Sequence, residues 1–326
     1  MHAVVMHTTG GPEVLRHEEV AEPLARSGWV TVRLHASALN WHDVLVRRGV
    51  YDTPLPHVPG ADGAGVRLDT GERVIILPSL FWGSREAAPA PGWEILGDLR
   101  QGTYADLVAV PQECVFPWPR GFDLAEAASF ALSSVTVHRA LVSRGRLVQG
   151  ESVLVLGASG GVATAATSLA SGLGAQVVVT SSAETKIAAA REVGAVDGVL
   201  HTDADWVEHA RAASPGGEGF DLVLDSVGRW RESVAALRPG GRCVVMGASD
   251  QPTATLDIRP YYFGQYELIG STMGSPRDMQ DLLRLVEDGL VSAPVIDRTY
   301  RLDEAAEAHR RLESGSGVGK VVLTHT

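Results

Sequence analysis

The feature that most constrains the fold is VLVLGASGGVA at residues 153–163, an apolar run that enters a glycine-rich turn. Helical periodicity follows at residues 163–173, so the segment predicts a strand, a tight turn and a helix. Glycines there let the backbone approach a pyrophosphate, although many such turns need glycine only for a positive φ. The strand before the turn and the βαβ spacing after it favour a dinucleotide site at Gly157, Ser159, Gly160, Gly161 and Val162.

Helices and strands alternate through the second half of the chain. Helices are predicted near residues 124–130, 135–144 and 276–288, and further strands at residues 176–180, 198–201, 220–225, 241–247 and 267–270. Continuous apolar strands joined by helices indicate a parallel sheet that is covered on both faces. The fold class is therefore α/β, with a doubly wound parallel sheet over residues 120–290.

The first 119 residues follow a different pattern. Short β-like runs, such as residues 29–35 and 72–77, are separated by Gly and Pro and predict a mostly β domain. The closing run at residues 319–324 returns to this style, so residues 291–326 are expected to complete the domain. Residues 84–92 are predicted to form an exposed loop.

Composition limits the partners of the chain. Its 326 residues carry a formal charge of −11, which repels nucleic acid and anionic membranes alike. The start of the sequence has no signal-peptide pattern, and no apolar run approaches the roughly eighteen residues that span a bilayer, so a cytoplasmic protein is expected. Cys114 and Cys243 are too few for a disulfide framework and are expected to be buried thiols.

The end of the second predicted strand carries the residues that distinguish NAD from NADP. Residues 179–182 read Val-Thr-Ser-Ser and lack the acidic side chain that would bind a ribose 2′-hydroxyl. Ser181, Ser182 and Lys186 suit a 2′-phosphate instead, so NADPH is the expected cofactor. Glu184 argues for NAD, and Ser182 could also be a helix cap with Lys186 a solvated charge.

Six separated landmarks resemble one family. They are ALNWHD at residues 38–43, LPHVPGADGAG at 55–65, GTYA at 102–105, GASGG at 157–161, RPGG at 238–241 and GKVV at 319–322. Together they resemble the medium-chain dehydrogenase/reductase superfamily, and within it the zinc-independent quinone oxidoreductase-like branch. The resemblance implies a GroES-like substrate domain, a Rossmann domain and an active cleft between them.

Zinc-dependent members of the superfamily carry metal ligands where this chain has Asn40, Ala61 and Ser133 or Ser134. Catalytic zinc needs three protein ligands of nitrogen, sulfur or carboxylate type, so no metal site of the family's kind is expected. Hydride transfer without zinc favours an electrophilic substrate, because hydrogen-bond donors must stabilise the developing oxyanion. A quinone or an α,β-unsaturated carbonyl is therefore the expected small-molecule substrate.

The resemblance also implies site residues. Asn40 would orient the substrate or nicotinamide and Asp43 would hold the loop, while His42 would donate or relay a proton unless it is a surface or capping residue. Tyr51 would contact the substrate or only pack. The resemblance implies further cofactor contacts in the helical region and at the predicted strand ends, from Thr136, Ser226, Gly247, Ser271 and Thr272. Hydroxyl residues at strand ends can, however, be only turn formers.

Two other functions stay open. An enoyl-thioester reductase, acting on acyl-CoA or carrier-bound chains, shares the fold and cofactor and would use Arg47 and Arg48 at a phosphate entrance. A protein that binds NADPH for a structural role alone is an alternative of another class. Many relatives dimerise through an edge strand, and residues 266–269 fit such a strand, so a homodimer is expected.

Overall fold

The computed structural model describes residues 1–24 and 26–325 and divides the chain into two compact units. Unit 1 comprises Met1–Ser133, Ser275–Leu283 and the chain from Ala293 onward. Unit 2 comprises Ser134–Gly274 and Arg284–Ser292. The first division lies inside a helix, α2 (Leu124–His138), 14 residues beyond the predicted boundary at residue 119.

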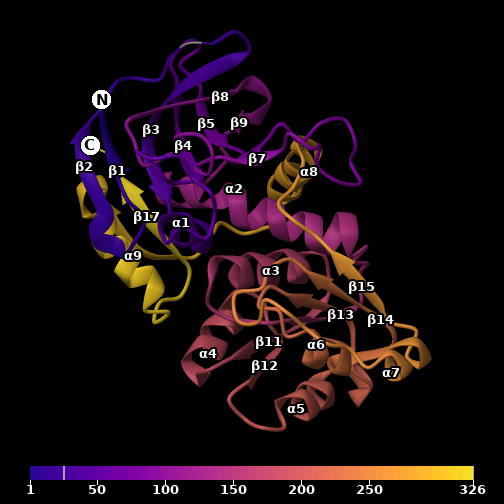
Figure 1. Cartoon of the computed structure of the whole chain (residues 1–326). Coiled ribbons are helices and arrows are strands. Elements are labelled where there is room, and N and C mark those ends of the chain that lie inside the picture. The colour runs from indigo at the N-terminus through magenta and orange to yellow at the C-terminus, as the bar shows by residue number, and fades with distance from the viewer. Residues whose placement is uncertain (25, 326) are drawn as a thin grey trace. The chain divides into compact units, whose positions relative to one another are not determined.

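Unit 2 is built on a parallel sheet of six strands (Figure 1). Its order is β12-β11-β10-β13-β14-β15, the doubly wound Rossmann order, which confirms the predicted fold class. Apolar residues bury both faces of its central strands. The strands are β10 (Ser152–Val155), β11 (Gln176–Ser181), β12 (Asp197–Leu200), β13 (Phe220–Asp225), β14 (Leu237–Val245) and β15 (Glu267–Gly270).

Helices flank this sheet in the connections between strands (Figure 1). They are α3 (Gly161–Gly172), α4 (Glu184–Glu192), α5 (Trp206–Ala213), α6 (Trp230–Ala236) and α7 (Ile258–Phe263). The prediction of separate helices at residues 124–130 and 135–144 is wrong, because α2 continues without a break into a π-helical turn, Arg139–Arg144. Residues 131–134 read Ala-Leu-Ser-Ser and contain no Gly or Pro that would end a helix.

Unit 1 is mostly β, as predicted. Its main sheet has the order β16-β17-β3-β4-β5-β9, with β8 also paired to β3, and the last strand of the chain lies antiparallel beside β3. Two small antiparallel pairs, β1-β2 and β6-β7, stand apart from it. The strands are β1 (His2–Met6), β2 (Leu15–Glu19), β3 (Trp29–Ala38), β4 (Asp62–Arg67), β5 (Arg73–Ile76), β6 (Ser79–Leu80), β7 (Glu94–Ile95), β8 (Leu107–Pro111), β9 (Val115–Pro117), β16 (Ile296–Arg301) and β17 (Lys320–Thr324).

Few helices belong to unit 1. They are α1 (Trp41–Arg47), α9 (Ala305–Glu313), most of α8 (Pro276–Glu287) and the part of α2 up to Ser133. Helix α9 packs on α1, β16 and β17, and its buried alanines join an apolar core with β1. Residues 84–92 form the predicted irregular, largely exposed loop. Both cysteines are buried and free, as predicted.

No helix of the described residues is long and apolar enough to cross a membrane.

Candidate active site

A buried polar cluster in unit 1 surrounds the carboxylate of Asp62. Lys320 Nζ donates to Asp62 Oδ2 at 3.0 Å and to Asn40 Oδ1 at 2.5 Å. Asn40 Nδ2 donates to the same Asp62 oxygen at 3.0 Å, and the backbone N–H of Leu132 donates to Asp62 Oδ1 at 2.7 Å. The cluster joins β4, β17, α2 and the start of α1. The side-chain oxygen and nitrogen of Asn40 therefore each form a hydrogen bond within the protein.

Asp43 extends this cluster into α1. Its Oδ2 accepts hydrogen bonds from the Asn40 backbone N–H at 2.7 Å and from the Tyr104 hydroxyl at 3.2 Å. Complete burial raises the pKa of Asp43 to about 6, although the charge of His42 and the bond from Asn40 oppose this shift. The prediction that Asp43 is a hydrogen-bond acceptor holding this loop is confirmed.

His42 forms a hydrogen-bonded pair with Asp98. His42 Nε2 lies 2.5 Å from Asp98 Oδ1, and the two side chains are only 12% and 15% exposed. Burial lowers the pKa of His42, but the hydrogen bond and charge of Asp98, with the charge of Asp43, raise it by more, so the net direction is upward. Asn40 occupies the N-cap of α1, so His42 is neither a cap nor a surface residue.

Tyr51 completes this group. Its ring centroid is 4.9 Å from that of His42, and the two rings are tilted by 43°. Burial and the charge of Asp98 raise the pKa of Tyr51, which keeps its hydroxyl protonated. The structure therefore brings His42 and Tyr51 together and turns the side chain of Asn40 toward Asp62 and Lys320.

Sequence reasoning missed Asp98. It lies three residues beyond β7, 56 residues from its partner, and no local pattern marks it.

In unit 2, the predicted cofactor residues follow the carboxyl ends of five strands. Gly157, Ser182, Ser226, Gly247 and Ser271 come just after β10, β11, β13, β14 and β15. All of these strands are parallel, so their ends share one edge of the sheet (Figure 1). The strand order reverses between β10 and β13, which is the point where open α/β sheets bind ligands.

The turn from β10 to α3 combines a glycine of positive φ with open space at the start of the helix. Gly157 has φ +119°, which a residue with a side chain rarely adopts, and its N–H donates to Thr180 Oγ1 at 3.0 Å. Gly160 is the N-cap of α3, and a Cβ atom there would meet nothing within 4 Å. Ser159 precedes it, and Gly161 and Val162 open the helix, whose first N–H groups point outward.

The region expected to bind a 2′-phosphate contains two residues that were not predicted, His201 and Arg229. The N-cap of α4 is Ala183 without a side-chain cap, so Ser182 is not the helix cap; Ser181 is buried and its Oγ accepts from the Ala183 N–H at 3.3 Å. His201 N donates to Ser181 O at 2.9 Å. Burial lowers the pKa of His201, as do the charges of Arg229 and Lys186, while Asp250 opposes them. His201 and Arg229 were missed because the fold, not the sequence, brings them here.

Two hydroxyl groups lie near the end of β15. Thr136 Oγ1, on α2, is 3.6 Å from the sulfur of Met273, which directly follows Thr272. Ser271 Oγ is buried and has no hydrogen-bond partner among the residues described. A buried hydroxyl without a partner is costly, so a ligand that bonds to it would be stabilised.

We searched the described residues of both units for side chains that could bind a metal ion together. Across residues 1–24 and 26–325, no group of three or more His, Cys, Asp or Glu side chains is arranged to hold a metal ion. At the positions of the family's zinc ligands, Ala61 offers no donor and the side chain of Asn40 is already bonded.

The comparisons with known proteins agree with this architecture. Residues 26–120 match the family described as alcohol dehydrogenase GroES-like domain, and residues 161–288 match the one described as zinc-binding dehydrogenase. A crystal structure of an NAD-dependent alcohol dehydrogenase is 38% identical, with 99% of both chains covered and a TM-score of 0.93. The chain belongs to the medium-chain dehydrogenase/reductase superfamily.

Within this superfamily the chain is quinone oxidoreductase-like. The human quinone oxidoreductase is 28% identical over 334 residues, which cover 99% of this chain and 97% of that protein. A component of the pikromycin polyketide synthase of Streptomyces venezuelae is 34% identical over 312 residues, but the match covers 93% of this chain and only 8% of that protein. This medium-chain dehydrogenase/reductase is accordingly an oxidoreductase of a family that uses a nicotinamide cofactor.

Proposed function

We propose that the chain is an NADPH-dependent reductase of a quinone or an α,β-unsaturated carbonyl, and that it works without a metal ion. The observation that carries the proposal is the His42–Asp98 pair beside Tyr51, because it supplies a proton donor in a unit whose family zinc positions lack ligands. Similarity to the human quinone oxidoreductase supports the substrate class.

The bound cofactor would supply the hydride. Hydride addition to an enone carbon or a quinone leaves negative charge on oxygen, and this oxygen must then be stabilised and protonated. Asp98 holds Nε2 of His42, which leaves Nδ1, without a partner among the described residues, as the ring atom that can deliver a proton. The protonated Tyr51 hydroxyl can donate a hydrogen bond to the same oxygen.

The choice of NADPH rests on the residues near the end of β11. Ser182 is exposed and not used as a cap, and Lys186 lies in the first turn of α4. Charge-assisted hydrogen bonds from such groups suit a 2′-phosphate. The NAD-dependent relative and Glu184 in the first turn of α4 argue for the other cofactor, so the choice needs a direct test.

Lys186→Ala is expected to raise the NADPH KM about tenfold or more while it changes the NADH KM little, because only NADPH carries the 2′-phosphate. Steady-state rates with both cofactors measure this difference. Arg191→Ala is the matched control, since Arg191 lies on the same helix in an exposed ion pair with Asp197. Equal changes in both KM values for Lys186→Ala would remove the argument for NADPH.

The similarity to the polyketide synthase component supports a second candidate function, an enoyl-thioester reductase. One of its predicted contacts is corrected by the structure: Arg47 is 1% exposed and donates to Glu313 Oε1 at 2.7 Å. Arg48 donates to the same oxygen at 2.5 Å and is 46% exposed, so only Arg48 of the two remains accessible to a phosphate.

A substrate panel separates these functions. NADPH oxidation is measured with phenanthrenequinone, a linear enone and crotonyl-CoA, and the proposed function predicts turnover of the first two. Faster reduction of crotonyl-CoA would favour the thioester reductase. Tight NADPH binding with no turnover of any substrate would favour a structural NADPH-binding role.

We also propose a cytoplasmic homodimer. The support is that β15 lies at an edge of the unit 2 sheet, where an unpaired strand edge can bind a second copy.

A further inference from the structure

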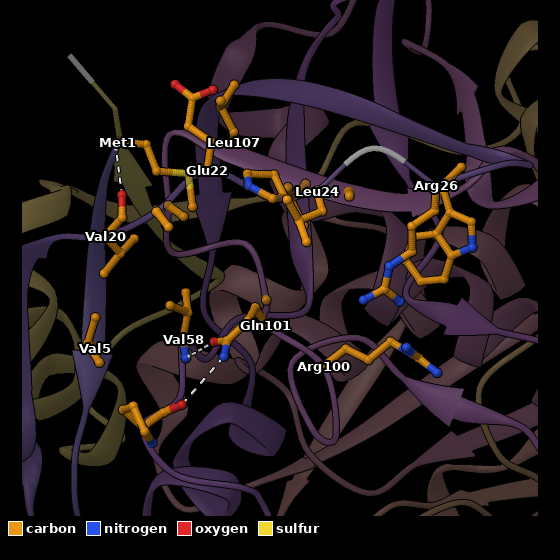
Figure 2. A pocket seen from close by; sticks show the side chains of 18 of the residues that line it. Met1, Val5, Val20, Glu22, Leu24, Arg26, Val58, Arg100, Gln101 and Leu107 are labelled. Carbon is orange, nitrogen blue, oxygen red and sulfur yellow. Dashed lines mark hydrogen bonds between the residues drawn. The ribbon is translucent and has the colours of Figure 1, made fainter.

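Unit 1 contains a cavity that none of the proposed active-site side chains lines. Its volume is about 520 Å³, within the roughly 300–1,000 Å³ that is usual for small-molecule sites. Residues 20–24 and 99–102 form two of its walls, and strand β8 forms another. Figure 2 shows Val5, Val58 and Leu107 among its apolar lining residues.

Gln101, a polar residue of the cavity lining, is bonded to the backbone of the cavity wall. The side-chain amide of Gln101 accepts from the Val58 N–H at 2.5 Å and donates to Pro56 O at 3.4 Å, as the dashed lines in Figure 2 mark. Its polar atoms are thus engaged with the backbone. Leu24 and Leu99 also line the cavity, and they are 79% and 55% exposed. A ligand with an apolar body would bury both.

One end of the cavity is cationic. The guanidinium groups of Arg26 and Arg100 lie 5.2 and 5.4 Å from the ring centroid of Trp29, which also lines the cavity. Arg100 is neutralised by Glu94, whose carboxylate accepts at 2.6 Å and 3.2 Å. Arg26 has no carboxylate partner among the described residues. Glu22 is the one acidic lining residue, and Figure 2 places it beside Met1, away from the two arginines.

We infer that this cavity binds a medium-chain fatty carboxylate. The alkyl chain would lie against the apolar walls, and the carboxylate would bond to Arg26, with Arg100 beside it. A guanidinium binds a carboxylate through two parallel hydrogen bonds. Because only one of the two arginines lacks a counter-charge, the site matches a monoanion rather than a phosphorylated ligand.

Calorimetric titration with decanoate and with decanol tests this site, since the two probes differ only in the charged head. Decanoate is expected to bind about tenfold or more tightly than decanol, the effect of one charge-assisted hydrogen bond. Arg26→Gln should remove that difference and leave decanol binding unchanged. Arg33→Gln is the matched control, because it removes an exposed arginine of the same unit that does not line the cavity.

A second variant tests the location. Ala109 lines the cavity, so Ala109→Phe should fill it and abolish binding of both probes, with circular dichroism showing that the variant folds. Equal affinity for both probes, or decanoate binding that neither Arg26→Gln nor Ala109→Phe weakens, would overturn the inference. A dimer that dissociates on Leu24→Ser would also overturn it, because a second copy of the chain would then cover the cavity.

Discussion

Lys320→Met is expected to lower the free energy of unfolding of unit 1 by about 3–5 kcal/mol, because it leaves the Asp62 carboxylate buried without its cation. Lys320 and Asp62 are 4% and 0% exposed, so water cannot replace the lost partner. Asn40 would lose a bond at the same time, which loosens the start of α1. Differential scanning calorimetry would show the loss as a lower unfolding temperature for this unit.

Arg191→Met is the control for this stability measurement. It breaks an ion pair of similar length in which both side chains are about half exposed, and such pairs contribute only about 0–1 kcal/mol. The double variant Asp62→Asn with Lys320→Met should recover part of the stability, since no unpaired charge then remains buried. If Lys320→Met were no more damaging than Arg191→Met, the cluster would not be what holds α1 and β17 together.

His42→Gln is expected to lower kcat for quinone or enone reduction roughly 100-fold, the lower range for loss of a general acid. The cofactor KM should stay unchanged, because the cofactor residues lie in unit 2. Asp98→Asn should have a smaller effect on kcat, since His42 keeps its ring but loses the partner that orients it. His7→Gln is the matched control, because His7 forms an exposed pair with Glu18 on the same unit.

The pH profile separates proton donation from a structural effect. The donor form of His42 is lost as pH rises through its pKa, so kcat should fall on the alkaline side of that value. Asp98 raises this pKa, so Asp98→Asn should move the falling part of the profile to lower pH. A variant with a lower rate but an unshifted profile would mean that Asp98 acts on packing alone.

The sequence predicted the elements of the fold well where local patterns decide them. The apolar runs of β10 and β13, and the glycine turn after β10, identify the strands because a strand buried on both faces has little choice of residue. The predicted break inside α2 was wrong, because the small residues there indicate neither a helix nor the end of one strongly.

The candidate site was only partly predictable, for a different reason. The landmark segments that contain Asn40, Asp62 and Lys320 were all identified, but nothing in them showed that their side chains meet in one hydrogen-bonded cluster. Asp98 and His201 were missed because their partners are distant in sequence. Contacts of this kind depend on the register of whole strands, which single-sequence patterns do not specify.

One measurement tests the central claim most directly. The protein is treated with a chelator and then given an enone and NADPH that carries deuterium at both C4 positions, and transfer of deuterium to the product is followed. The account predicts one deuterium on the β-carbon of the saturated product, at a rate that the chelator does not change. A product without deuterium, or a rate that is lost on chelation and restored by zinc, would contradict it.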